Sequence, residues 1–403
     1  MPALNKAGIF FEGLYYNDDG FTFSSKEGVA RLKKIVRWLL FLGGSLLLIL
    51  VMLLITYGST SHSELKGTLQ QKITAYMNEE AAEIQFNGTV LVAKDGKILF
   101  QKGYGFSDYS EKVPNQVDTE YRIASLTKSF TALSILQLEA AGKLKTSDLI
   151  SNYFPGFRNG EKITIHDLLT HSSGVKDHFK ITDTTKPITI SGVIDLMSQE
   201  PLSFSPGTKY VYSNTGYTIL AGIIERVSGE SYGNYLRTHI FRIAGMNHTY
   251  LNEDDAEMLA DGFRNMKKLE MKDDESQLAG SGDIISTVGD LQKYDNAIHN
   301  GRLLPSKEIK KMETGYINSA RWGVFKYGYG WNVADNLISF GRPMIEHNGS
   351  LPGFKSEFVD FVDDRVTVIV LSNNNGTWNS GALARELASI CLGKRFWFYE
   401  KYF

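Results

Sequence analysis

Ser125 and Lys128 stand three positions apart at the start of a long apolar stretch. Side chains three apart on a helix share one face, so the hydroxyl and the amine are expected to lie side by side. A serine hydroxyl needs a neighbouring group to take its proton, and a lysine can do so if burial lowers its pKa from about 10.4. A helix N-terminus also favours an oxyanion. The pair predicts acyl transfer, with Ser125 as nucleophile and Lys128 as general base.

The same spacing occurs at Ser63–Lys66 and Ser173–Lys176, and an ordinary solvated helix turn explains most such pairs. Ser63 follows a hydrophobic span in a polar segment, and Ser173 precedes a glycine, as in a turn. Only Ser125 precedes a helical apolar pattern that would bury it centrally. The apolar positions of that pattern are Phe130, Leu133, Ile135, Leu136 and Leu138.

Residues 121–128, YRIASLTK, closely resemble the nucleophile motif of class C β-lactamases and the related penicillin-binding proteins, DD-peptidases and esterases. Residues 163–174, ITIHDLLTHSSG, are similar to the family's next segment. Residues 212–214, YSN, which follow FSPG at 204–207, resemble its second motif, and HNG at 347–349 resembles its third. The resemblance covers roughly residues 85–392, in the family's order.

The two shorter motifs recur elsewhere, so their flanks matter. Tyr212 follows a Pro-Gly turn and precedes an apolar helical segment at 219–227, whereas His347 precedes strand-like segments at 354–361 and 366–371. These contexts favour Tyr212 and His347 over the other matches. The other matches are Tyr15, Tyr76, Tyr250, Tyr294 and Tyr316 for the second motif, and His299 for the third.

The resemblance implies a role for each of these residues. Tyr212 would relay a proton to the leaving group, and Asn214 would contact the substrate's amide. The backbone N–H groups of Ser125 and Ser350 would form the oxyanion hole. Gly349, which has no side chain, would let the backbone approach the substrate closely.

His347 occupies the position where lactamases carry a lysine that holds the antibiotic's carboxylate. An imidazole offers less positive charge, and its charge is expected to vary near neutral pH. Nor does the sequence show the acidic deacylation group known from class A enzymes. The resemblance therefore implies a D-alanyl or D-amino-acid peptidase or esterase, with weak or no β-lactamase activity.

Composition excludes several classes of protein. The chain has 403 residues, 42% of them hydrophobic, which is enough for a sizeable core. The net charge is −2 with dispersed basic residues, so no nucleic-acid partner is expected. The single cysteine, Cys391, excludes an intrachain disulfide. His166 and His171 lack further ligands at zinc-site spacing, so we expect neither a metal nor a cofactor.

Residues 38–57 carry no charge over 20 positions, which at about 1.5 Å per residue spans the apolar core of a bilayer. The h-region of a cleaved signal peptide is usually shorter. Basic residues gather before the span, which predicts a cytoplasmic N-terminus and an extracytoplasmic hydrolase. They are Lys26, Arg31, Lys33, Lys34 and Arg37, against Lys66 and Lys72 after it.

The predicted organisation has five parts: a cytoplasmic tail at 1–37, a transmembrane helix at 38–57, a connector at 58–84, the hydrolase domain at 85–392 and an aromatic, basic tail at 393–403. Strands are expected at 87–93 and 98–103, around an Asp95-Gly96 turn, and again at 354–361 and 365–371, before a helix at 380–392. The predicted fold class is mixed α/β, more specifically α+β, with the serine β-lactamase/DD-peptidase-like fold that the resemblance implies. Its antiparallel sheet comes from both ends of the domain, with flanking helices and a mainly helical subdomain.

These features predict a membrane-anchored, extracytoplasmic serine hydrolase whose substrate is a small-molecule or cell-wall acyl compound. The alternative is a non-catalytic module that binds cell-wall material or a partner through the same groove. A metal-dependent hydrolase is disfavoured by the histidine spacing. The sequence leaves the oligomeric state and the natural substrate open.

Overall fold

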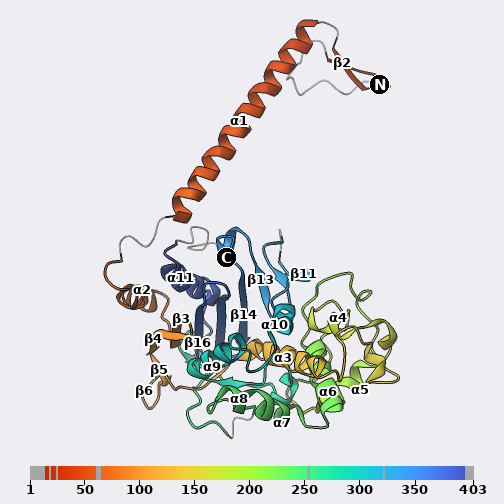
Figure 1. The fold of residues 1–403 in the computed structure, drawn as a ribbon, viewed down its shortest axis with the longest axis vertical. Coiled ribbons are helices and arrows are strands. Elements are labelled where there is room, and N and C mark those ends of the chain that lie inside the picture. The colour runs from red at the N-terminus through yellow and green to blue at the C-terminus, as the bar shows by residue number, and fades with distance from the viewer. Residues whose placement is uncertain are drawn as a thin grey trace. The chain divides into compact units, whose positions relative to one another are not determined.

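A computed structural model describes residues 14–17, 20–23, 26–59, 65–251, 255–320 and 323–394. The chain divides into two compact units, residues 1–59 and 60–403. The first unit contains the hairpin of β1 (Leu14–Asn17) and β2 (Gly20–Phe23) and the helix α1 (Lys26–Ser59), drawn in red in Figure 1. The expected tail at 395–403 lies outside the described residues.

The helix α1 begins twelve residues before the predicted span, because the charged residues that precede the span also favour helix. Within the described residues it contains the one segment that is long and apolar enough to cross a membrane, Lys33–Val51. The side chains of this segment are exposed; Trp38, for example, is 58% accessible. A signal sequence near the N-terminus meets the same description.

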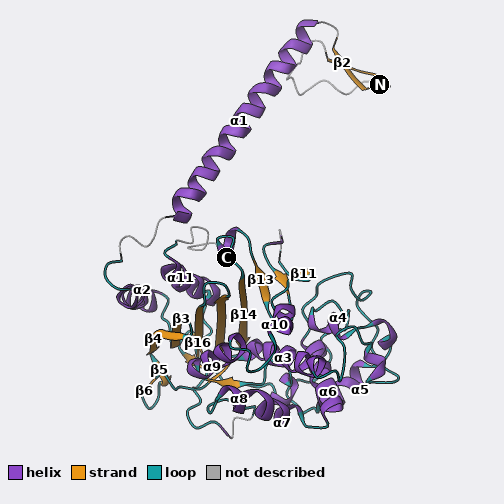
Figure 2. Ribbon diagram, in the orientation of Figure 1, coloured by secondary structure: helices purple, strands orange, loops and turns teal. Residues whose placement is uncertain are grey.

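The second unit is built on an eight-stranded, fully antiparallel sheet whose strands appear together in Figure 2. Strands from the two ends of the domain meet where β16 pairs with β3, as predicted. The Asp95-Gly96 turn joins β3 to β4 with positive φ at both residues, which fits a tight hairpin. The strand order is β11 (Ile317–Asn318), β12 (Lys326–Tyr327), β13 (Asn332–Ala334), β14 (Met344–Leu351), β15 (Phe354–Phe361), β16 (Val366–Ser372), β3 (Gly88–Lys94) and β4 (Lys97–Tyr104).

The central strands are buried on both faces, so their apolar residues serve two cores. In β3, Val90 and Val92 join one hydrophobic cluster, whereas Leu91 and Ala93 join the other. This follows from the alternation of side chains along a strand. Helices α2 (Leu69–Glu83) and α11 (Ser380–Leu392) contribute to the first cluster, and α3 (Thr127–Ala140), α6 (Asn214–Ser228) and α9 (Val288–His299) to the second.

The helix α2 lies within the predicted connector, but it belongs to the hydrolase unit. Ile73 and Met77 are fully buried in the cluster that α11 and the sheet share. Thr68 and Gln71 form a capping box that starts this helix. The expected boundary at residue 85 is therefore too late, because the buried face of α2 has few apolar positions and reads as polar in sequence.

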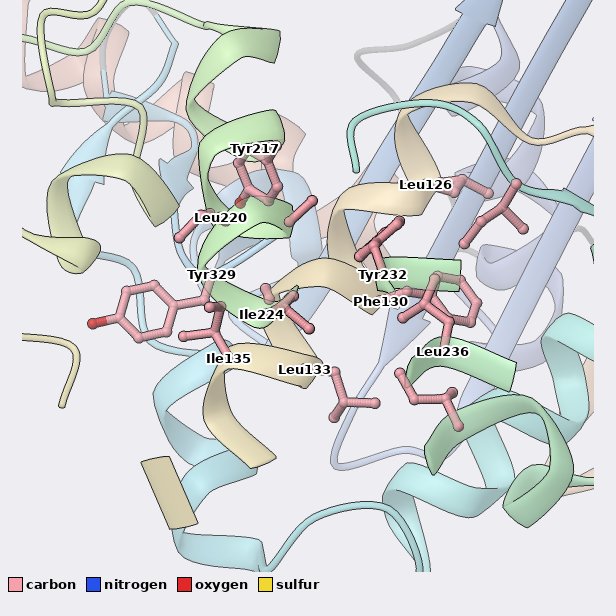
Figure 3. Close-up of a cluster of buried hydrophobic side chains, with 14 of the residues drawn as sticks. Leu126, Phe130, Leu133, Ile135, Tyr217, Leu220, Ile224, Tyr232, Leu236 and Tyr329 are labelled. Atoms are coloured by element: carbon pink, nitrogen blue, oxygen red, sulfur yellow. The ribbon is translucent and has the colours of Figure 1, made fainter. Parts of the chain in front are cut away.

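In the sequence, the predicted helical subdomain lies between β4 and β11. Its helices include α4 (Ile165–Leu169), α5 (Ile190–Met197), α7 (Tyr232–Leu236), α8 (Arg242–Ala244) and α10 (Ser306–Met312). The helix α3 is buried among them: Figure 3 shows Phe130 and Leu133 of α3 near residues of α6 and α7. Three small two-stranded antiparallel sheets complete the unit: β5 (Phe106–Asp108) with β6 (Val113–Pro114), β7 (Tyr121–Arg122) with β10 (Ile285–Ser286), and β8 (Phe263–Arg264) with β9 (Lys267–Lys268).

Candidate active site

Ser125 lies on a 3₁₀ turn, Ala124–Leu126, which leads directly into α3. The helix itself begins at Thr127, two residues later than a helix opened by Ser125 would require. Ala124 has φ +50°, a left-handed conformation that is strained for a residue with a Cβ atom. The hydrogen bond from Ile123 N–H to the Ile284 carbonyl, 3.0 Å, holds the approach to this turn. Ser125 thus sits on a strained turn that its surroundings fix.

Lys128 points from the first turn of α3 to Ser125, and its side chain is fully buried. Its Nζ lies 3.0 Å from Ser125 Oγ, 2.9 Å from Asn214 Oδ1 and 2.7 Å from the Ser281 carbonyl oxygen. An amide oxygen and a backbone carbonyl only accept hydrogen bonds. A neutral amine that donates to both therefore directs its lone pair at the Ser125 hydroxyl.

Burial lowers the pKa of Lys128 to about 7, although the nearby charges of Asp177 and Asp283 act in the opposite direction. A substantial fraction of the amine is consequently neutral at physiological pH. The arrangement meets both requirements for a general base, because the lone pair is directed at the nucleophile and the pKa is close to the working pH.

Tyr212 completes the contacts to Ser125, since its hydroxyl donates a hydrogen bond of 2.9 Å to Ser125 Oγ. Burial raises the pKa of Tyr212 well above its usual range, so the phenol is protonated. The Lys128 ammonium position lies 4.8 Å from the Tyr212 ring centroid. A hydrogen-bonded phenol fits this environment, and a phenolate does not.

Asn214 is the first residue of α6, with Ser213 as the N-cap. Its side-chain Nδ2 donates to Asp177 Oδ2 over 3.1 Å, which leaves Oδ1 directed at Lys128. The predicted site residues Ser125, Lys128, Tyr212 and Asn214 therefore form one continuous hydrogen-bonded group. Ser125 and Asn214, which are 89 positions apart in the sequence, belong to the same group because α3 and α6 pack side by side.

His347 lies on β14 beside this group but does not behave as the sequence suggested. Burial, with a further contribution from the Lys128 charge, lowers the pKa of His347 to about 3. The imidazole is therefore neutral throughout the physiological range, and the expected variation of charge near neutral pH is wrong. Its Nδ1 lies 2.7 Å from the Asn348 carbonyl, so Nδ1 carries the proton and Nε2 accepts from the Tyr327 hydroxyl at 2.9 Å. Both ring nitrogens are thus occupied.

Gly349 and Ser350 follow on the same strand. A Cβ atom at Gly349 would lie 2.2 Å from Ser356 Oγ and 2.4 Å from the Ile123 carbonyl oxygen. The close approach that requires glycine is therefore to the backbone before the nucleophile turn, rather than to substrate. This contact draws β14 against the turn that carries Ser125, and Ser350 lies exposed at the edge of the same cavity.

A cavity of about 670 Å³, large enough for a peptide-like or drug-sized substrate, is lined by Ser125, Tyr212, Asn214, His347 and Ser350. Apolar and aromatic side chains make up much of its wall, and they are Phe179, Tyr210, Leu278, Phe325, Tyr327 and Leu351. Among the described wall residues none is a lysine or arginine. Glu346, which also lines it, is paired with Arg385 over 2.6 Å. The described wall therefore offers no lysine or arginine to a substrate carboxylate.

Several residues of this site carried no signal in the sequence. Asp177 and the carbonyl of Ser281 contact motif residues through loops, and no local pattern marks them. Tyr327 belongs to a Lys-Tyr-Gly-Tyr-Gly stretch that resembles no catalytic motif. His171, by contrast, belongs to the family-like segment 163–174 and also adjoins the site: Ser213 N–H donates to its Nδ1 at 3.1 Å, and its ring centroid lies 4.2 Å from that of Tyr212.

A separate buried cluster consists of Asp295, His299 and Asp360, whose potential metal-ligating atoms lie within 4.8 Å of one another. His299 Nδ1 lies 3.2 Å from Asp295 Oδ1, and its Nε2 lies 3.2 Å from Asp360 Oδ2. Burial lowers the pKa of His299, but the two carboxylates outweigh it and raise the value to about 10. His299 Nδ1 also lies 3.1 Å from the Asp295 backbone carbonyl, and burial together with the Asp295 charge raises the pKa of Asp360 to about 7. The imidazole therefore links α9 to β15.

Comparisons with known proteins agree with the fold. The Beta-lactamase family model matches residues 69–391. The chain is 34% identical over 339 residues to penicillin-binding protein 4* of Bacillus subtilis, covering 77% of this chain and 74% of that protein. The structure of the octameric penicillin-binding protein homologue from Pyrococcus abyssi superposes with a TM-score of 0.71 at 27% identity, covering 81% and 78% of the two chains.

The chain therefore belongs to the Beta-lactamase family and is a serine hydrolase of the penicillin-binding-protein type. The D-amino acid amidase of Ochrobactrum anthropi SV3 shares the fold, with a TM-score of 0.68 at 22% identity and coverage of 81% and 98%. The match from residue 69 also agrees with the placement of α2 inside the hydrolase unit.

Proposed function

We propose that this protein is a membrane-anchored, extracytoplasmic hydrolase that forms an acyl-enzyme on Ser125 and acts on D-amino-acid esters, amides or peptides. The observation that carries the proposal is the position of Lys128. Its amine is buried, has a pKa near neutrality, and lies 3.0 Å from Ser125 Oγ with two obligate acceptors on its other sides.

In the proposed reaction Ser125 Oγ attacks the substrate's carbonyl carbon while Lys128 takes the hydroxyl proton. The backbone N–H groups of Ser125 and Ser350 would stabilise the oxyanion. When the bond to the leaving group breaks, Tyr212 would donate its proton to the leaving oxygen or nitrogen and recover one from Lys128. Water then hydrolyses the ester on Ser125 by the reverse sequence of proton transfers.

The charge of the cavity bears on the substrate. A neutral His347 and a described wall without lysine or arginine give a substrate carboxylate no fixed cation to bind. Esters and amides of D-amino acids are therefore better substrates than penicillins or peptides recognised through a terminal carboxylate. D-alanyl carboxypeptidase activity is the less favoured form of this proposal.

The membrane anchor is proposed from the apolar helix Lys33–Val51 and the basic residues before it. This topology would place the active site on the side of the membrane where cell-wall polymers occur. The proposed substrate class and the proposed location therefore agree.

The direct test compares acyl substrates on the full chain in detergent. We expect hydrolysis of D-alanyl esters and D-amino-acid amides, and slow turnover of benzylpenicillin. Fast penicillin turnover by the unmodified protein, or a complete lack of ester and amide hydrolysis, would contradict the proposal.

A further inference from the structure

The start of α6, which carries Tyr212 and Asn214, is held by a short segment that precedes it in sequence. His171 Nδ1 accepts from the Ser213 N–H at 3.1 Å. Asp177 Oδ2 accepts from both the backbone N–H of Asn214, at 3.2 Å, and its side-chain Nδ2, at 3.1 Å. Ser213 and Asn214, two successive residues of the second motif, are thus both held by the segment 171–177.

The next residue continues this pattern. The backbone N–H of His178 donates to Thr215 Oγ1 at 2.7 Å, and its ring Nδ1 lies 2.9 Å from the same oxygen. The other ring nitrogen, Nε2, lies 3.0 Å from the Gln277 carbonyl. Since that carbonyl only accepts, Nε2 carries the proton and Nδ1 accepts from the Thr215 hydroxyl. Asp177 therefore sits on a rigid support, with His178 fully buried behind it.

Asp177 fixes which end of the Asn214 amide faces the general base. Only Nδ2 can donate to a carboxylate, so Oδ1 must point to Lys128, where it accepts at 2.9 Å. Resting on the proposed function, we propose that Asp177 is a positioning residue for acylation. It orients Asn214 against Lys128, and its negative charge favours the protonated form of the Lys128 amine.

The second part of the proposal depends on the charges around Lys128. Burial is the dominant influence and lowers its pKa, whereas Asp177 and then Asp283 raise it. The other groups near the amine are uncharged near neutral pH, because burial lowers the pKa of the imidazoles and raises that of the phenols. They are His171, His347, Tyr212 and Tyr217. Removing the charge of Asp177 should therefore lower the pKa of Lys128.

Two substitutions separate orientation from charge. Asp177→Asn keeps an oxygen acceptor for Asn214 but removes the charge, whereas Asp177→Ala removes both. The control is Asp183→Asn, which removes an exposed carboxylate that caps Thr185 in the same part of the chain. The measurement is the rate at which a fluorophosphonate modifies the full chain between pH 5 and 9, followed by intact mass, with the thermal unfolding midpoint recorded for each variant.

For Asp177→Asn, we expect the rise of the modification rate with pH to occur about one pH unit lower than in the unmodified protein. The maximal rate at high pH should be similar in the two proteins. Asp177→Ala should show the same displacement and a maximal rate lower by about ten- to hundredfold. Asp183→Asn should match the unmodified protein. If both Asp177 variants lost only thermal stability and kept the original pH dependence, the residue would be purely structural and the inference would be wrong. Failure of the unmodified protein to react at Ser125 would instead contradict the proposed function itself.

Discussion

The Nζ atom of Lys128 lies 3.0 Å from Ser125 Oγ, while the same amine meets Asn214 Oδ1 and the Ser281 carbonyl, two acceptors that have no proton to give. This relationship explains how a lysine can serve as a base. Two of the amine's directions are used for donation, and the third faces the hydroxyl that must lose its proton. Burial supplies the low pKa that keeps the lone pair available.

The pH dependence of acylation follows from this relationship. Only neutral Lys128 can accept the proton, so the rate should rise with pH through about 7 and level off above it. Lys128→Ala should lower the rate by about 10²–10⁴-fold. Lys128→Arg, which keeps the charge but cannot lose its proton, should be equally slow. Stopped-flow measurement with a chromogenic ester tests this, and an active arginine variant would contradict the role of base.

Tyr212→Phe should slow acylation by about 10²–10⁴-fold, because it removes the hydroxyl that lies 2.9 Å from Ser125 Oγ. The matched control is Tyr210→Phe, which alters a phenol that lines the same cavity. We expect the control to stay within a few fold of the parent. Equal effects of the two substitutions would mean that the relay does not pass through Tyr212.

His347→Lys should favour penicillin over the D-alanyl ester, because it places a cation beside the cavity where the parent has a neutral imidazole. A charge-assisted hydrogen bond to the carboxylate should raise penicillin acylation by about tenfold or more. His347→Gln is the neutral control and should show no such gain. The ratio of the two acylation rates is the measurement, and an unchanged ratio in the lysine variant would contradict this interpretation of His347.

The topology makes a prediction that is independent of catalysis. Protease added to intact cells or spheroplasts should release a fragment that starts near residue 60 and retains esterase activity, since the described hydrolase unit begins at Leu65. Permeabilised cells provide the control for protease access. Protection of the unit in intact cells, with cleavage only after permeabilisation, would contradict the proposed orientation.

Much of the fold could be predicted because local patterns matched the final elements. The strand at 354–361 and the helix at 380–392 coincide with β15 and α11, and the Asp95-Gly96 turn lies where its residues require it. Ser125, Lys128, Tyr212 and Asn214 could be named because their motifs have recognisable flanks. The structure brings these four into direct contact.

The remainder depends on burial and on contacts between distant segments. The neutral state of His347 comes from complete burial, and sequence position alone does not reveal that environment. Asp177 reaches Asn214 from 37 residues away, and the Ser281 carbonyl reaches Lys128 from 153 residues away. The core role of α2 was missed for a similar reason, because its buried stripe consists of few residues in a polar helix.

The most direct test of the central claim is intact-mass measurement after treatment with a fluorophosphonate, for the unmodified protein and for Ser125→Ala. The substitution removes one oxygen without creating a large cavity, so the unfolding midpoint should stay close to that of the parent. We predict one added phosphonyl group on the unmodified protein, mapped to Ser125, and none on the variant. An equal adduct on folded Ser125→Ala would contradict the assignment of the nucleophile.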